Sequence, residues 1–350
     1  MVETRKVQVT GGSTYTVSIP KEWATENDVS AGTEVEFYPE GDSLFLTPVS
    51  DEERTEGTLD IGDLSGDQLT RAVMTMYVSG FDVIALEAGR ITNDQRRSIR
   101  GAVQSLVGLE VLEETRDRVV VRDLLDSSEL SIHNAVTRMR LIAVSMLEDA
   151  VDALADGDED MARDVIQRDD DVDRLYMVVS RIFRATLRTP KAAEDIGLSR
   201  EVCFDYHSSA RQLERVADHA TKIAHITLEL YEGSEIADAS APTADGGRAE
   251  LPAELTDALR ALDEEARGVV DRGMEALFAE DSATATELAN EARGAVLGVD
   301  ERAREIDELL RELDPARAQL LGLIVDSVSR SADYGGNIAE TALQKAAPSP

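Results

Sequence analysis

The chain has 350 residues, of which 42% are hydrophobic and 30% are charged. This length gives room for two to four compact domains, and the hydrophobic share is ordinary for globular proteins, which excludes wholesale disorder. The net charge is −34, from 36 basic and 70 acidic side chains.

The acid excess is accompanied by only five lysines, a balance typical of halophilic proteins that work in molar salt. At that salt the Debye length is about 3 Å, so self-repulsion is screened and a negative net charge does not exclude nucleic-acid binding. No apolar run of eighteen residues and no basic-then-apolar leader occur, which predicts a cytoplasmic protein. The single cysteine, Cys203, excludes a disulfide framework and a cysteine-based zinc site.

Residues 1–49 have the pattern of strands and turns. Strands are predicted over residues 5–10 and 15–19, a short helix after Pro20, and a hairpin that pairs residues 35–37 with 44–46. So short a hairpin region buries little surface alone, so we expect it to dimerise.

Two stretches of this region carry a family resemblance. Arg5-Lys6-Val7-Gln8 and Tyr15-Thr16-Val17-Ser18-Ile19-Pro20-Lys21-Glu22-Trp23 resemble the AbrB/SpoVT/MazE family. The resemblance implies a swapped-hairpin dimer that presents basic strand ends to DNA. Residues 1–21 hold three cations against Glu3, a local charge of +2 that phosphate contact requires. The predicted DNA-binding residues are Arg5, Lys6, Thr14, Tyr15 and Lys21. The alternative is a dimerisation hairpin without DNA contact.

Residues 51–57 are predicted to be a charged linker, and residues 58–126 a small α/β sandwich domain. Strands are expected over residues 82–87, 109–112 and 119–121, and helices over residues 68–79 and 94–106. We find no motif of chemistry in this domain, and expect it to space or dimerise the rest.

From Ser131 to Lys345 the hydrophobic spacing is helical. Two triplets of helices are predicted, separated by a connection over residues 237–252: 131–155, 159–188 and 199–231, then 252–279, 283–312 and 316–344. Similar sequences at matching places indicate a duplicated three-helix unit. The predicted fold is therefore multidomain and mainly α: an N-terminal swapped-hairpin β module (1–49), a small α/β sandwich domain (58–126) and two tandem three-helix bundles (130–233 and 252–345).

The last helix of each triplet carries a related motif. The two copies read Arg211-Gln212-Leu213-Glu214-Arg215-Val216-Ala217-Asp218-His219-Ala220-Thr221-Lys222-Ile223-Ala224 and Ser329-Arg330-Ser331-Ala332-Asp333-Tyr334-Gly335-Gly336-Asn337-Ile338-Ala339-Glu340. They resemble the signature of the PhoU family of phosphate-uptake regulators. The resemblance implies metal ions held on the bundle surface, and association with phosphate transporters and phosphate-sensing kinases.

Carboxylate pairs recur at helical spacing in the first triplet. Glu214 and Asp218 lie one turn apart on a polar face, and Asp169 and Asp173 repeat that spacing on the preceding helix. Such pairs repel unless a cation bridges them, and they suit divalent or ferric ions. The predicted metal ligands are Asp169, Asp173, Glu214 and Asp218. Acids occupy 70 of 350 positions, so a solvated acidic face is the alternative.

Neighbouring positions leave further alternatives. His207 is either an extra ligand or a surface histidine, and Lys222 is a fixed cation that would replace a metal beside Asp218. In the second triplet Ser329 stands in place of the glutamate, and Ala292 and Val296 stand near the expected places of the two aspartates, which argues against a second cluster.

The sequence lacks a glycine-rich phosphate loop and a histidine pair at metalloprotease spacing, and Cys203 with His207 is a weak nucleophile–base candidate. We therefore expect a non-enzymatic protein. The leading hypothesis is a DNA-binding regulator that exerts negative control on phosphate transport. The alternatives are an adaptor that contacts a phosphate ABC transporter ATPase or a sensor kinase, with hairpins only for dimerisation, and a metal store or sensor.

Overall fold

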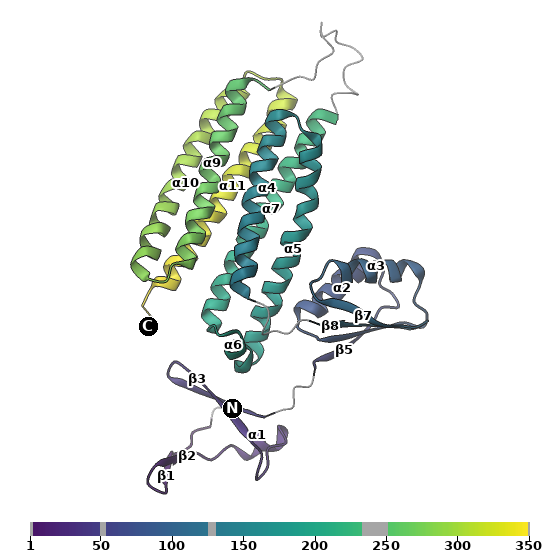
Figure 1. Cartoon of the computed structure of the whole chain (residues 1–350), viewed down its shortest axis with the longest axis vertical. Coiled ribbons are helices and arrows are strands. Elements are labelled where there is room, and N and C mark those ends of the chain that lie inside the picture. The colour runs from purple at the N-terminus through teal and green to yellow at the C-terminus, as the bar shows by residue number, and fades with distance from the viewer. Residues whose placement is uncertain (1–2, 50–53, 125–130, 233–250, 349–350) are drawn as a thin grey trace. The chain divides into compact units, whose positions relative to one another are not determined.

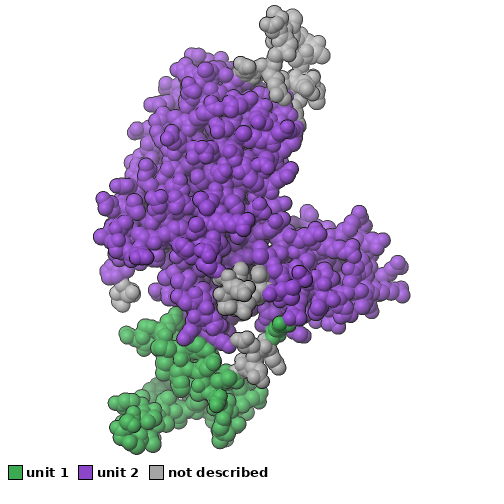
Figure 2. Space-filling view, viewed as in Figure 1, with its two compact units in different colours: residues 1–54 green, residues 55–350 purple. Residues whose placement is uncertain are grey.

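The computed structural model describes residues 3–49, 54–124, 131–232 and 251–348. It divides into two compact units, residues 1–54 and 55–350, shown in different colours in Figure 2. The chain is mainly helical, with strand hairpins first, then a small sheet and then long helices (Figure 1). Within the described residues, no helix combines the length and apolar character needed to cross a membrane.

The first unit consists of two separate hairpins and a short helix. Its elements are β1 (Gln8–Thr10), β2 (Thr14–Thr16), α1 (Lys21–Glu26), β3 (Val35–Glu40) and β4 (Ser43–Pro48). β1 pairs antiparallel with β2, and β3 with β4. Gly11 and Gly12, in the first turn, have φ angles of 65° and 85°, which glycine adopts without steric cost.

The second hairpin agrees with the prediction, since Phe37 pairs with Leu46. The first hairpin is shorter than the predicted strands over residues 5–10 and 15–19. A three-residue pairing on each side of a glycine turn leaves Arg5 and Lys6 before the strand rather than within it.

The second unit begins with a two-layer α/β domain. Its sheet has the order β5 (Glu56–Asp60), β6 (Val83–Glu87), β8 (Arg118–Asp123) and β7 (Leu109–Glu114). β5 and β6 are parallel, whereas β8 is antiparallel to both of its neighbours. Helices α2 (Gly66–Val78) and α3 (Asn93–Gln104) cover one face, where their apolar side chains share a core with alternate strand residues (Figure 1).

The prediction of a charged linker over residues 51–57 is wrong at its end. Glu56 and Gly57 already belong to β5, paired with Val83 and Ile84 of β6, while residues 51–53 lie outside the described residues. The strand was missed because its hydrophobic alternation is weak: Leu59 is the one large apolar residue among its five.

Six long helices and one short one follow in the described residues. They are α4 (Ile132–Asp156), α5 (Glu159–Arg188), α6 (Pro190–Ile196), α7 (Arg200–Glu232), α9 (Ala253–Phe278), α10 (Ser282–Leu310) and α11 (Pro315–Ala346). Side-chain caps define several starts: Ser131, Asp158 and Asp281 each accept a hydrogen bond from a backbone N–H three residues on. The sequence predicted the long helices but not α6, whose seven residues, led by Pro190, are too few for a periodic pattern.

The two triplets, α4–α5–α7 and α9–α10–α11, share one continuous apolar core. They meet where α7 packs along α11 and α4 packs along α9 (Figure 1). α9 and α11 approach closely because two glycines line their crossing: a Cβ on Gly335 would lie 2.6 Å from the Val270 nitrogen, and one on Gly273 would lie 2.6 Å from the Gly335 oxygen.

Arg181 of α5 connects the α/β domain to the helices through hydrogen bonds and ion pairs. Arg181 donates to the backbone oxygens of Tyr77 and Phe81 at 2.6 and 3.1 Å. It also pairs with the carboxylates of Asp82 and Asp123 at 2.7 and 2.9 Å, and its side chain is only 11% exposed. Four contacts from one guanidinium fix α5 to the end of α2 and to the sheet.

Candidate functional site

The packing of α5 against α7 brings the four predicted metal-binding carboxylates into one electrostatic cluster. Asp169 and Asp173 come from α5, and Glu214 and Asp218 from α7. Within this carboxylate cluster Asp173 and Asp218 are exposed, while Asp169 and Glu214 are partly buried. The one-turn spacing on each helix sets the four side chains on facing stripes.

Burial, and then mutual repulsion, disfavours the charged form of the carboxylates in this cluster. Burial, followed by repulsion from Asp173 and Asp218, raises the pKa of Asp169 to about 6. Burial and then the charge of Asp218 raise the pKa of Glu214 to about 7. The pKa values of Asp173 and Asp218 are raised as well, chiefly by burial. Near neutral pH the cluster therefore favours either a proton or a cation.

One oxygen of the cluster lacks a partner. Glu214 Oε2 is buried and accepts no hydrogen bond from the described residues, while its Oε1 lies 3.8 Å from Arg211 Nη1. A buried acceptor without a partner is costly, and a hard cation would satisfy it. The described residues contain no group of three or more His, Cys, Asp or Glu side chains gathered closely enough to hold a metal ion. The cluster is thus a loose set of donors and not a formed coordination shell.

Arginines, not Lys222, are the cations that act on this cluster. Arg211 and Arg215 lower the pKa of Asp218 against the effect of burial. Lys222 acts instead on His219, whose pKa is lowered first by burial and then by that lysine. The idea that Lys222 replaces a metal at Asp218 gains no support from this geometry.

His207 and Cys203 are both more enclosed than a surface position. His207 stacks between Tyr176 and Phe183, with ring centroids 5.8 and 4.7 Å away. Burial, followed by the charges of Arg184 and Arg211, lowers its pKa. Cys203 is buried, and burial raises the pKa of its thiol to about 11. A thiol with that pKa is protonated near neutral pH, so Cys203 is not an activated nucleophile.

The second triplet has a reduced version of the cluster. His219 Nε2 lies 3.3 Å from Tyr334 Oη, and these matching positions are 115 residues apart. On that spacing Asp333 corresponds to Asp218, and Asp300 raises the pKa of Asp333 against Arg330, although burial is the larger cause. Asp300, and not Val296, is therefore the counterpart of Asp173.

Val296 occupies the place of Asp169. Its Cγ2 would lie 3.2 Å from a Cβ on Gly336, which corresponds to Thr221, and Thr221 is the residue whose hydroxyl lowers the pKa of Asp169. The sequence comparison of the two triplets was therefore displaced by one helical turn on α10, since it matched Val296 with Asp173 and not with Asp169. Arg330 approaches Asp326 and Asp333 at 3.7 and 3.5 Å, so the second site holds its own counter-charge.

The predicted DNA-binding residues are all exposed in the first unit. They are Arg5, Lys6, Thr14, Tyr15 and Lys21. Thr14 and Tyr15 lie on β2, Lys21 begins α1, and the Arg5 guanidinium pairs with Glu3 at 2.5 Å. The hydroxyl groups and cations of these residues therefore lie at the surface of the first unit, where a phosphate group could reach them.

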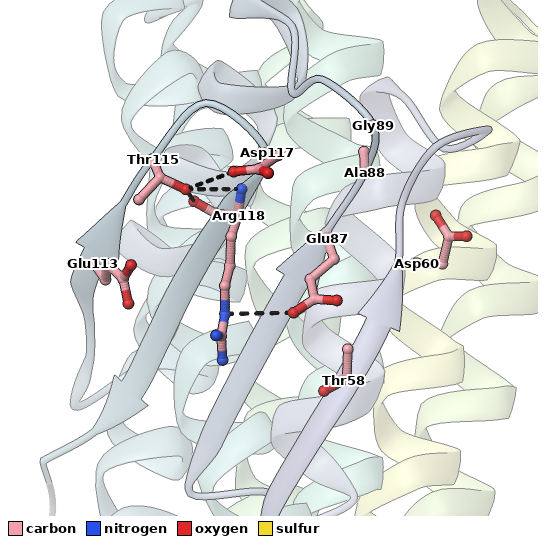
Figure 3. Close-up of a pocket in the computed structure, with 9 residues that line it drawn as sticks. All are labelled: Thr58, Asp60, Glu87, Ala88, Gly89, Glu113, Thr115, Asp117 and Arg118. Carbon is pink, nitrogen blue, oxygen red and sulfur yellow. Dashed lines mark hydrogen bonds and ion pairs between the residues drawn. The ribbon is translucent and has the colours of Figure 1, made fainter.

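The α/β domain contains a pocket that the sequence did not reveal. It has a volume of about 600 Å³ and is lined by Thr58, Asp60, Glu87, Ala88, Gly89, Glu113, Thr115, Asp117 and Arg118 (Figure 3). It lies at the carboxyl ends of the parallel strands β5 and β6, beside the β7–β8 turn. Arg118 Nε lies 3.5 Å from Glu87, and the lining also includes the carboxylates of Asp60, Glu113 and Asp117. The missed strand β5 was the signal that would have revealed it, since ligands often bind where parallel strands end.

Two family models match the chain. Residues 136–227 match the PhoU domain, and residues 8–54 match "Antidote-toxin recognition MazE, bacterial antitoxin". The first match falls on α4 to α7, where the carboxylate cluster lies, and the second falls on the hairpin unit. The predicted combination of a PhoU-like helical region with a MazE-like N-terminal module is confirmed.

Three relatives are each named "Phosphate-specific transport system accessory protein PhoU homolog". That of Pseudomonas aeruginosa is 28% identical over 144 residues, 40% of this chain and 57% of the relative. That of Clostridium acetobutylicum is 30% identical over 113 residues, 32% of this chain and 50% of the relative. That of Pseudomonas putida is 33% identical over 92 residues, 26% of this chain and 34% of the relative. The chain thus spans about half the length of the relatives it matches, or less.

Two solved structures are similar to the chain. The phosphate transport system regulatory protein PhoU from Streptococcus pneumoniae gives a TM-score of 0.45 at 17% identity, over 61% of this chain and 91% of that one. PhoU from Pseudomonas aeruginosa gives a TM-score of 0.43 at 20% identity, over 61% of this chain and 93% of that one.

Proposed function

We propose that this chain is a non-enzymatic, DNA-binding regulator that exerts negative control on phosphate uptake. The observation that carries the proposal is the union, in one chain, of a PhoU domain and a MazE-like module. The helical region receives a signal of phosphate status, and the hairpin module delivers it to an operator.

The surface of the first unit supports the contact with DNA. Residues 1–21 keep a local excess of two positive charges in a chain of −34, and the cations Lys6 and Lys21 are exposed. Neither lysine has an ion pair within the described residues, so both ammonium groups are free for phosphate. Hydroxyls on β2 add uncharged phosphate donors.

A gel-shift titration with promoter fragments of phosphate-transporter genes tests this proposal at several salt concentrations. If each lysine meets one phosphate, Lys6→Glu or Lys21→Glu in both subunits of a dimer reduces the slope of log affinity against log salt by roughly 2. Arg97→Glu, at an arginine whose side chain is 78% exposed in the other unit, is the control and should leave the slope unchanged. Equal binding by all four proteins would remove DNA contact from these lysines.

The hairpin unit also supports dimerisation. Tyr38 is the buried hydrophobic residue of its described part, whereas Val7, Val9 and Leu44 are 63–64% exposed. So many exposed apolar side chains on so few residues leave the unit without a core of its own, and a second copy would cover them. Sedimentation of Val9→Asp should show a weaker dimer than the wild type; an unchanged dimer would place the interface elsewhere.

The carboxylate cluster is proposed to take a divalent or ferric cation. Its oxygen donors, its raised pKa values and the unpartnered Glu214 Oε2 fit a hard ion. Such an ion would supply counter-charge, and Asp169, Asp173, Glu214 and Asp218 would close around it. Metal analysis after metal-replete expression should find bound metal that falls in Asp173→Ala; an empty wild-type protein would defeat the proposal.

A second candidate is an adaptor that acts by protein contact. The printed names of the relatives, accessory proteins of a phosphate-specific transport system, favour it. In this role the helical region contacts a phosphate ABC transporter ATPase or a sensor kinase, and the hairpins only dimerise. Co-purification of the transporter ATPase with Lys6→Glu and Lys21→Glu proteins that no longer bind DNA would separate this role from the first.

A further inference from the structure

Helices α5 and α7 carry a row of stacked rings beside the carboxylate cluster. Tyr176 stacks on His207 with centroids 5.8 Å apart, His207 on Phe183 at 4.7 Å, and Phe183 contacts Phe204 at 6.0 Å. Aromatic residues make up only 4% of the chain. Three of them in one row, with a histidine between, are therefore a concentration that requires a reason.

The outer end of this row is apolar and open to solvent. Phe204 is 51% exposed and Leu187, one turn after Phe183 on α5, is 57% exposed. Tyr176 packs against the apolar core of the bundle, but Phe183, Leu187 and Phe204 are not part of that core. Single exposed apolar residues are ordinary, whereas a contiguous exposed group marks an interaction surface.

Arginines flank the same rings. Arg184 is exposed, and no carboxylate of the described residues pairs with it. Its charge lowers the pKa of His207, after burial and before Arg211, so two cations converge on this ring. Arg211 lies over the Tyr176 ring at 5.4 Å. In a chain with 70 acids and 36 bases, an arginine left without an acid indicates that its counter-charge comes from elsewhere.

We propose that Phe183, Arg184, Leu187, Phe204, His207 and Arg211, the aromatic–arginine face, dock an acidic segment of a partner protein that carries a large apolar anchor. The anchor would cover Phe204 and Leu187, and carboxylates beside it would pair with Arg184 and Arg211. A partner as acidic as this chain is repelled by most of its surface, and a local reversal of charge is where it approaches most easily.

Charge also argues against two other occupants. In a second copy related by a twofold axis, Arg184 of one subunit would face the same patch of the other, so like charges would meet. A nucleic acid strand extended along the row of rings would meet Glu214 and Asp218, the carboxylate cluster that follows Arg211 on α7. A short acidic segment that ends at Arg211 avoids both penalties.

This face would serve the second candidate function, the adaptor that acts by protein contact, and on that point the inference rests on the proposed function. Arg211 links the two sites, since it lies on Tyr176 and 3.8 Å from Glu214. A change of charge at Glu214 would therefore alter the hold on Arg211 and, through it, the docking surface.

Peptide display on the full-length protein tests the face. Random twelve-residue peptides are selected on wild type, and the enriched peptides are synthesised and titrated by fluorescence anisotropy. We expect sequences rich in Asp and Glu around Leu or Phe. Their affinity should fall at least about tenfold in Phe204→Ala and in Arg184→Glu, as for a central anchor and its charged neighbour.

The second triplet offers a matched control. Arg293 is exposed on α10 without an ion pair to described residues, and Leu297, one turn on, is 67% exposed, but α10 itself carries no aromatic or histidine ring. Leu297→Ala and Arg293→Glu should leave peptide affinity within twofold. Promoter binding should be unchanged in all four variants, so a failure of the DNA proposal and a failure of this one give different results.

Three outcomes would overturn the proposal. Enriched peptides that bind Phe204→Ala and Arg184→Glu as tightly as wild type would place docking elsewhere. Tighter binding of a single-stranded DNA oligonucleotide than of any acidic peptide, lost in Arg184→Glu, would assign the face to nucleic acid. A dimer that dissociates in Phe204→Ala during sedimentation would assign it to a second copy.

Discussion

Replacing Glu214 by glutamine removes a partly buried charge of the carboxylate cluster while keeping the shape of the side chain. The pKa of Glu214 rises from an ordinary 4.5 to about 7, by burial and then the charge of Asp218. At about 1.4 kcal/mol per pKa unit this rise corresponds to about 3 kcal/mol. Solvent screening at the partly exposed cluster reduces the expected effect to about 1–2 kcal/mol.

The sign follows from the raised pKa. The folded state favours protonated Glu214, so its contribution to stability is fully present below pH 4.5 and is lost as the pH rises through about 7. Glutamine resembles the protonated form at every pH. With cations removed by chelation, Glu214→Gln should match wild type near pH 4.5 and exceed its free energy of unfolding by about 1–2 kcal/mol at pH 8.

Urea unfolding followed by circular dichroism, at fixed molar salt, measures this difference. Glu229→Gln changes an exposed glutamate on the same helix and should follow wild type at both pH values. A cation at about 100 times its Kd should add about 2.7 kcal/mol to wild type and much less to Glu214→Gln. If Glu214→Gln is no more stable than wild type at pH 8 without cations, the buried and repelled charge of Glu214 is not a cost and the argument for a bound ion fails.

Two further predictions concern the helical packing. Arg181→Met removes the guanidinium that pairs with the Asp123 carboxylate, which is 5% exposed, and should cost about 3–5 kcal/mol in chemical unfolding. The control Arg97→Met, at a side chain that is 78% exposed, should cost less than about 0.5 kcal/mol. Gly335→Ala places a Cβ 2.6 Å from the Val270 nitrogen and should lower stability by about 1–3 kcal/mol, whereas Gly294→Ala enters open space on α10 and should be neutral or stabilising.

The sequence was sufficient for the fold wherever a long periodic pattern met a clear end signal. Ser131 and Asp158 cap their helices as side-chain acceptors, and Gly157 closes α4 with a φ of 66°. Two short elements, β5 and α6, were missed because their five and seven residues carry neither a clear periodicity nor a strong apolar run. Their positions are decided by partners distant in the chain, such as the pairing of Thr58 with Ala85.

For the candidate sites, spacing predicted which carboxylates share a face but not what surrounds them. The pairs Asp169–Asp173 and Glu214–Asp218 come from helices that pack together, as their mutual effects on pKa require. The stacking of His207 depends on Phe183, 24 residues away on another helix, and so could not be derived from local pattern. Burial at such positions is a property of the tertiary packing.

The two triplets differ in the charges at matching positions of their carboxylate sites. In the second triplet Val296 replaces one carboxylate, Ser329 replaces another, and Arg330 lies 3.5 Å from Asp333, one of the two that remain. That arrangement needs no ion, because its counter-charge is covalently part of the helix. In the first triplet Arg211 reaches only one oxygen of Glu214 and leaves the other buried and unsatisfied. The first triplet therefore keeps the carboxylates on which the proposed ion site depends, while the second triplet packs against α7 through the contact of His219 with Tyr334.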